Sequence, residues 1–187
     1  DNDAVSDAES RFAVAVAENR ERILSRMAHY EQALRGGVAL FNASEEVSRT
    51  EWKAFVESMQ VAQRLPGIQG MGWCVLVRPA DLETHVEAIR AEGFPDYSVR
   101  PSGPRDIYTS IIYLEPFSGS NLRAFGYDMH SEMVRRKAMD MARDSGQASL
   151  SGKVTLVQEG EGERQAGSLM YVPVYAQGPD AGTVDGR

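Results

Sequence analysis

Eight polar residues lie near the predicted ends of strands that are rich in aromatic residues and methionine. They are Tyr108, Tyr113, Glu115, Tyr127, Asp128, Ser151, Thr155 and Tyr171. A pocket for a small molecule is mostly apolar, with a few converging hydrogen-bonding groups, and residues of this kind can furnish one. The predicted polar contacts to the ligand are Tyr113, Glu115, Asp128 and Ser151, and the predicted aromatic wall of the pocket consists of Trp73 and Tyr127.

A purely structural interpretation competes with each of these assignments. Tyrosines in strands commonly lie in the core with the hydroxyl at its rim. Asp128 could cap a helix that begins near Ser131, and Glu115 could order the loop that starts at Pro116. Both interpretations stay open at this level.

Catalytic and metal-binding patterns find no support. The glycines at 67, 70 and 72 lack the G-x-G-x-x-G spacing and lead into a predicted strand instead of a helix. The three histidines fall on separate predicted segments without metal-ligand spacing, and no G-x-S-x-G turn occurs. We therefore expect no catalytic residue, no metal and no cofactor. An enzyme is the last-ranked alternative, and it would need a cleft that pairs Glu115 with His130.

The composition is that of an ordinary globular protein, with 42% hydrophobic and 25% charged residues in a chain of 187. Twenty basic residues against 27 acidic ones give a formal charge of -7, which argues against nucleic acid or anionic lipid as the main partner. Cys74 is the single cysteine, so one chain can form no internal disulfide and no cysteine-based metal site.

The first element expected from the hydrophobic pattern is a long helix. Apolar residues from Phe12 to Leu34 recur at helical spacing and predict a helix over about residues 4–34. At about 1.5 Å per residue it would be roughly 45 Å long, so part of it should project as a stalk. Its narrow apolar stripe predicts either packing on its own domain or pairing with a second copy.

Shorter elements of both kinds follow. Ser48 and Glu51 form a capping box at the start of a second helix, which ends at Pro66-Gly67. The other predicted elements are strands at 68–77, 107–113, 124–129, 153–158 and 167–175, and helices at 80–92 and 131–146. This order predicts a mixed α/β (α+β) fold with a mostly antiparallel sheet flanked by helices.

The ends of the chain suggest a fragment of a longer protein. No run approaches the roughly 20 apolar residues that cross a bilayer, and the N-terminus lacks the pattern of a signal peptide. Turn-forming residues from 178 to 186 predict a linker that leads onward.

Eight ordered sequence blocks between about residues 12 and 176 carry a family resemblance. They include RILSRMAHYEQALRGG (22–37), LPGIQGMGW (65–73), YLEP (113–116), AFGYDM (124–129) and SGKVTLVQE (151–159). On these blocks the chain resembles a CHASE domain, the extracytoplasmic sensory module of membrane-bound histidine kinases and cyclases.

The resemblance implies a stalk helix and a membrane-distal PAS-like domain that holds the ligand, followed by a membrane-proximal subdomain and a second transmembrane helix. It divides the chain into a stalk helix with connector at 1–48, the sensory domain at 49–177 and a linker at 178–187. In plant members the distal pocket binds cytokinins, which are adenine derivatives. A purine-like compound or another small metabolite is therefore the expected ligand.

Together these features predict a non-enzymatic sensor. We expect the chain to be the periplasmic part of an inner-membrane receptor, either a histidine kinase or a diguanylate cyclase or phosphodiesterase. We also expect it to form a homodimer through its N-terminal helix. The alternative is a protein-interaction or dimerisation module that binds no small ligand.

Overall fold

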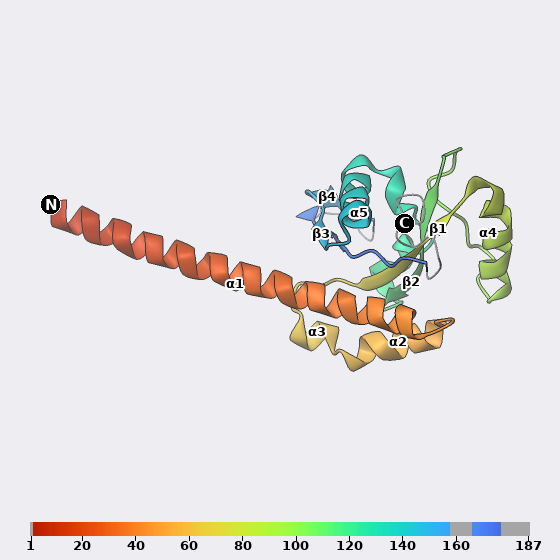
Figure 1. Cartoon of the computed structure of the whole chain (residues 1–187), viewed down its shortest axis with the longest axis horizontal. Helices are drawn as coiled ribbons and strands as arrows, with labels where there is room; N and C mark the ends of the chain where they lie inside the picture. Colours follow the sequence, from red (N-terminus) through yellow and green to blue (C-terminus); the bar gives the residue numbers. More distant parts are fainter. Residues whose placement is uncertain (1, 158–165, 177–187) are drawn as a thin grey trace.

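The computed structural model describes residues 2–157 and 166–176, and its longest element is the N-terminal helix α1 (Asn2–Ala43). Figure 1 shows α1 projecting from one side of a domain of helices and strands. The projecting part is exposed, with 71% of Phe12 and 61% of Ile23 accessible to solvent. None of the helices in the described ranges combines the length and the apolar composition needed to cross a membrane.

The predicted helix end at residue 34 is wrong, because α1 continues through Gly36 and Gly37 to Ala43. Both glycines face helix α2 (Arg49–Ser58). A Cβ atom at Gly36 would lie 3.3 Å from the Phe55 ring, and one at Gly37 would lie 3.4 Å from the Trp52 ring. The close packing of α2 offsets the low helix propensity of glycine, about 1 kcal/mol per residue.

The capping box at the start of α2 is confirmed. The Ser48 hydroxyl accepts a hydrogen bond from the Glu51 amide at 3.2 Å, and the Glu51 carboxylate accepts one from the Ser48 amide at 2.8 Å. The Ser48 hydroxyl also donates to this carboxylate at 2.7 Å, and the bonds from the Ser48 amide and hydroxyl lower the pKa of the Glu51 carboxyl. The second helix is nevertheless shorter than predicted, since Gln60 adopts a left-handed φ of 51° before the short helix α3 (Val61–Arg64).

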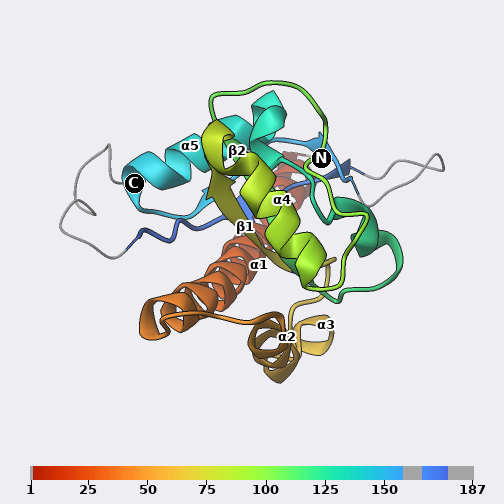
Figure 2. The ribbon, with the colours of Figure 1, turned by 90° about the vertical axis from the view of Figure 1, so that its right-hand side faces the viewer.

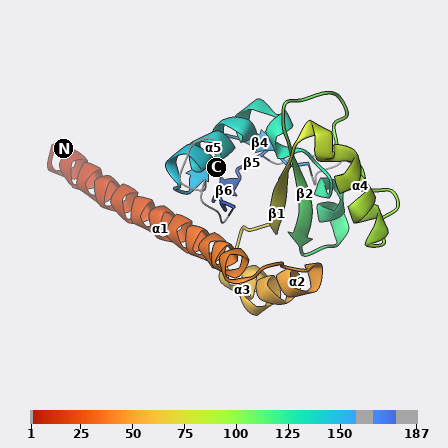
Figure 3. The ribbon, with the colours of Figure 1, turned by 45° about the vertical axis from the view of Figure 1, so that its right-hand side comes forward.

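Strands β1 (Met71–Val77) and β2 (Tyr108–Glu115) form an antiparallel pair at the centre of the domain. Figures 2 and 3 show helix α4 (Leu82–Ala91) along one side of this pair and helix α5 (Met133–Ser145) on the other. The register shifts between Trp73 and Cys74, which leaves Ile112 without a partner as a β-bulge.

The bulge decides which β2 side chains share a core. Ile111 and Leu114 contribute to one buried cluster, together with Ala124 and Met129. Tyr113 instead packs against a second cluster, formed by α1, α2 and the start of β1. Without the extra residue, strict alternation would place Ile111 and Tyr113 on the same face.

The segment predicted as a strand at 124–129 is not one. Ala124 ends the 3-10 helix η2 (Gly119–Ala124), and Tyr127 and Asp128 make only isolated bridges, to Arg100 and Ser110. Gly126 turns the chain here with a φ of 81°. The remaining short 3-10 helices are η1 (Pro79–Asp81) and η3 (Met129–Ser131).

The cap of helix α5 is Glu132, one residue later than the predicted cap Ser131. The Glu132 carboxylate caps it by accepting hydrogen bonds from the amides of Val134 and Arg135, at 2.9 and 3.0 Å. Gly146 ends the helix in the left-handed conformation, as predicted.

In the described part of the chain, the segments predicted as strands at 153–158 and 167–175 contain only strands of two residues. Strand β3 (Ser149–Leu150) pairs with β6 (Met170–Tyr171), and β4 (Val154–Thr155) pairs with β5 (Ala166–Gly167). The described residues therefore form three small antiparallel sheets instead of one. The mixed helix and strand class is confirmed, and the predicted linker at 178–187 lies outside the described residues.

Candidate ligand-binding site

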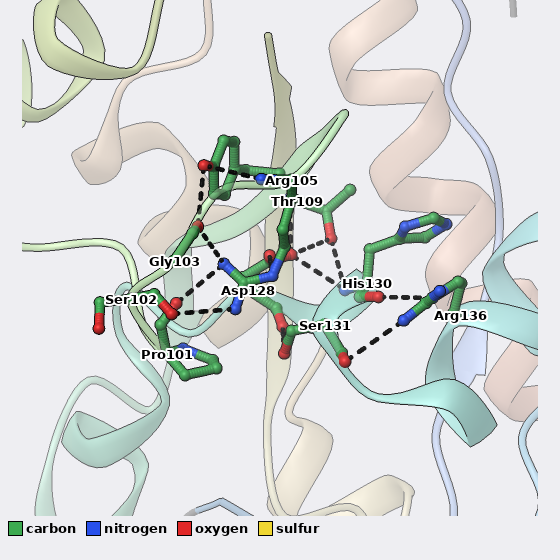
Figure 4. Close-up of polar contacts among 10 residues, drawn as sticks. Pro101, Ser102, Gly103, Arg105, Thr109, Asp128, His130, Ser131 and Arg136 are labelled. Atoms are coloured by element: carbon green, nitrogen blue, oxygen red, sulfur yellow. Dashed lines mark hydrogen bonds and ion pairs between the residues drawn. The ribbon is translucent and has the colours of Figure 1, made fainter. Parts of the chain in front are cut away.

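The Asp128 carboxylate lies completely buried between β2 and η3 (Figure 4). Its Oδ1 atom accepts hydrogen bonds from the Thr109 amide at 2.9 Å, the Thr109 hydroxyl at 3.2 Å and the His130 amide at 3.1 Å. The other oxygen, Oδ2, lies 3.4 Å from Arg105 Nε without hydrogen-bond geometry. Asp128 is thus a buried, charge-compensated carboxylate that joins β2 to η3.

Arg105 covers this carboxylate from an exposed loop. Its guanidinium donates hydrogen bonds to the carbonyl oxygens of Pro101 and Gly103, at 2.9 and 3.2 Å (Figure 4). The loop is therefore wrapped around the side chain that neutralises Asp128. The structural role considered for Glu115 is present, because its Oε2 atom accepts a hydrogen bond from the Phe117 amide at 3.1 Å. Asp128 caps the short helix η3, whereas the helix predicted to begin near Ser131 is capped by Glu132.

A buried polar chain that the sequence analysis missed joins β2 to α4. The Ser110 hydroxyl lies 2.7 Å from the Tyr97 hydroxyl, which lies 2.8 Å from His85 Nε2. Burial raises the pKa of Tyr97 and lowers that of His85. The lowered pKa favours the neutral imidazole, so this chain is a structural link between neutral groups.

The six predicted ligand contacts fall into two groups. Trp73 pairs with Tyr113 across the strands, and Glu115 lies two residues farther along β2. Tyr127 instead lies under the Arg135 guanidinium, which is 5.3 Å from its ring centre, and Asp128 follows it. Ser151 donates a hydrogen bond to the Gly152 carbonyl at 2.8 Å and accepts one from the Leu169 amide at 2.9 Å.

The first group adjoins a pocket of about 380 Å³ between α2 and the end of β2, called the α2 pocket below. Its lining residues are Arg49, Thr50, Trp52, Lys53, Glu57, Tyr113, Leu114, Glu115, Pro116, Phe117 and Ser118. Two of the six predicted contacts, Tyr113 and Glu115, are among them. Trp73 does not line the pocket and is stacked on Phe41 of α1, with ring centres 3.7 Å apart.

Arg49, the first residue of α2, is one of the residues that line this pocket. Its Nε donates to the Glu92 carboxylate at 2.7 Å, and Nη1 donates to the carbonyl of Ile112 at the β-bulge. The guanidinium lies over the rings of Phe94, Tyr113 and Phe125, 4.5 to 5.2 Å from their centres. It thereby joins α2, β2 and the end of α4 through charge-assisted and cation-π contacts.

The electrostatics of the pocket favour acceptor groups near Arg49. Arg49 Nη2 and Trp52 Nε1 are buried N–H groups without a hydrogen-bond partner in the part of the chain that the structure describes. Burial raises the pKa of Tyr113, whose hydroxyl donates to the Val47 carbonyl at 2.8 Å, while Arg49 opposes this rise. Arg49 and Trp52 were missed as site residues, since their spacing predicts only a helix start and a core face.

Within the described ranges, no three histidine, cysteine, aspartate or glutamate side chains come together as metal ligands. The pairing of Glu115 with His130 that the enzyme alternative needs is not formed, because His130 Nε2 lies 2.9 Å from Asp140.

Comparison with known proteins identifies the family. The family model described as CHASE domain matches residues 45–187, well over half of the chain. No curated protein matches the sequence. CHASE domains are the extracellular sensory domains of membrane receptors, and they are not catalytic. The chain therefore belongs to the CHASE domain family of signalling receptors.

Proposed function

We propose that this chain is the extracytoplasmic ligand-binding domain of a transmembrane receptor, a histidine kinase or a diguanylate cyclase or phosphodiesterase. In that receptor the domain is PAS-like, lies in the periplasm and is anchored to the inner membrane. A small molecule binds in the α2 pocket, and α1 carries the response toward the membrane. CHASE family membership supports the sensory role.

One observation carries the choice of the α2 pocket. Trp52 lines this pocket and also packs against Gly37 of α1, where a Cβ atom would lie 3.4 Å from its ring. A ligand that moves Trp52 therefore acts directly on the stalk helix. A differential affinity of about 1–3 kcal/mol between two arrangements of α1 is enough to shift output roughly 5- to 150-fold.

Filling the α2 pocket is expected to abolish ligand binding. Purines, amino acids and carboxylates are screened for a rise in melting temperature, since a ligand at 100 times its Kd stabilises by about 2.7 kcal/mol. Thr50→Trp places a ring in the pocket, whereas Ala54→Trp places one on the same helix outside it. The proposal requires that a compound raises the melting temperature of the wild type and of Ala54→Trp, but not that of Thr50→Trp. If no compound class raises the melting temperature of the wild type, the proposal is contradicted.

Dimerisation through α1 is the second expected result. Phe12, Val16 and Ile23 are 71%, 49% and 61% exposed, and their spacing of four and seven residues fits a coiled-coil seam. Light scattering should detect a dimer of the wild-type chain and a monomer of the Ile23→Asp variant. Val14→Asp, an exposed position on the opposite face of α1, should leave it intact. A monomeric wild-type chain at high concentration removes the stripe as a dimer contact.

A protein-interaction module is the second candidate function, and an exposed face of α5 favours it. Met133 and Met141 are 75% and 56% exposed, two turns apart on the same face. Signalling that depends on this face alone would be insensitive to Thr50→Trp, so the pocket-filling pair of variants separates the two candidates.

A further inference from the structure

We infer that the α2 pocket binds a zwitterionic amino acid with an apolar side chain. This inference rests on the proposed function, because it names the chemistry of the ligand at the same pocket. Three features support it: unpartnered donors, a carboxylate at the end of β2 and aromatic walls.

The donors select a carboxylate. Arg49 Nη2 and Trp52 Nε1 are buried N–H groups without a partner among the described residues, and both side chains line the pocket. Neither group can accept a hydrogen bond, so only an acceptor satisfies them. Buried donors left unpaired are rare in native proteins and call for a ligand, an ion or water. Lys53, one turn after Arg49, adds a positive charge on the same wall.

The acidic residues of the pocket select an ammonium group. Glu115 lines the pocket and uses Oε2 to accept from the Phe117 amide at 3.1 Å, and Glu57 lies one turn beyond Lys53. The Lys53–Glu57 ion pair is 3.7 Å long and more than half exposed, so it is weak and easily replaced. A simple anion would meet repulsion from both glutamates, whereas a zwitterion offers a partner to each kind of charge.

The remaining walls suit an apolar side chain of modest size. Trp52, Tyr113 and Phe117 present aromatic rings, and the volume of about 380 Å³ is near the lower end of ligand pockets. An amino acid such as leucine or phenylalanine has the required carboxylate, ammonium and apolar group in one small molecule.

Binding at these donors also requires movement. Both nitrogens are covered by neighbouring atoms, so the carboxylate reaches them only when α2 shifts away from β2. Trp52 packs on Gly37, so this shift displaces the stalk helix. The amino acid thus binds one arrangement of α1 better than the other, as a sensor ligand must.

The test uses the indole N–H signals of the two tryptophans, Trp52 and Trp73, in the NMR spectrum of the intact chain. Leucine and phenylalanine are expected to move the Trp52 signal downfield and to leave Trp73, assigned with Trp73→Phe, less affected. The amide of each amino acid lacks the carboxylate and its N-acetyl form lacks the ammonium, so both should bind at least tenfold more weakly. Equal binding of the amide or the N-acetyl form overturns the inference.

Variants provide the matched controls. Trp52→Phe keeps an aromatic side chain, smaller than the indole, and removes the donor, and Glu115→Gln removes the charge; each should weaken binding about tenfold. Glu83→Gln, an exposed change on α4, should leave the affinity unchanged. Because Trp52 is in the core, Glu115→Gln is the deciding variant if Trp52→Phe unfolds.

The failure of this inference is distinguishable from failure of the proposed function. A purine or a simple carboxylate that moves the Trp52 signal, while no amino acid does, overturns the ligand class and leaves the sensor pocket supported. If no compound of any of these classes moves the Trp52 signal, the inference and the α2 pocket fall together.

Discussion

Replacing Asp128 with alanine is expected to lower the free energy of unfolding by about 3 kcal/mol, which is a large fraction of the stability of a domain. The change removes the acceptor shared by the Thr109 amide, the Thr109 hydroxyl and the His130 amide. The Thr109 amide would stay buried without this partner, whereas the His130 amide would keep the Thr109 hydroxyl oxygen as an acceptor at 2.9 Å. Arg105 would also lose its counter-charge, although its partial exposure lets water replace part of that interaction.

Chemical denaturation of three variants checks this result. Asp128→Asn keeps one acceptor oxygen in a side chain of the same shape, so it should cost less than Asp128→Ala. Asp106→Ala removes an exposed carboxylate from the adjoining loop and should change stability by less than about 0.5 kcal/mol. An Asp128→Ala protein within 1 kcal/mol of wild type would mean that the buried carboxylate does not hold η3 to β2.

Gly126→Ala is expected to destabilise the domain by about 3 kcal/mol or more. Gly126 has a φ of 81°, and a Cβ atom there would overlap the carbonyl oxygen of Ser98. Its amide donates to the Ile111 carbonyl at 2.9 Å, and its carbonyl accepts from the Arg100 amide at 2.9 Å. The backbone therefore cannot move aside without breaking the bonds that place Asp128.

Gly93→Ala is the matched control for backbone strain alone. Gly93 also has a positive φ, 106°, but a Cβ atom there would meet nothing within 4 Å. Gly93→Ala should therefore lower the free energy of unfolding by only about 1 kcal/mol. The difference in this free energy between Gly126→Ala and Gly93→Ala measures the effect of the overlap with Ser98. Equal losses of stability in the two variants would contradict the close approach of Gly126 to Ser98.

The elements with local signals were predictable. Ser48 and Glu51 are three residues apart, and the capping box they form needs no other part of the chain. The helix at 80–92 and the strand at 107–113 correspond to α4 and β2 for the same reason, because the side-chain pattern repeats within each segment. The lengths of the strands at 153–158 and 167–175 were overestimated, since strand pairing depends on partners elsewhere in the chain.

The candidate site was predictable only in part. Tyr113 and Glu115 were chosen as polar residues at a strand end, and both line the α2 pocket. Arg49 carries no such signal, since its importance comes from Glu92 and the Ile112 carbonyl, 43 and 63 residues away. Asp128 was chosen for its residue type, but only the fold shows that its carboxylate is buried beneath Arg105.

The sequence by itself determined the stalk-like helix, the capped α2, the mixed fold class and the CHASE family, because periodicity, caps and ordered blocks are local properties. Only the tertiary structure decided that α1 continues through Gly36 and Gly37, since that depends on the rings of Phe55 and Trp52. It also decided that the predicted ligand contacts divide between two regions. Side-chain convergence depends on register, and the bulge at Ile112 determines which face each β2 residue occupies.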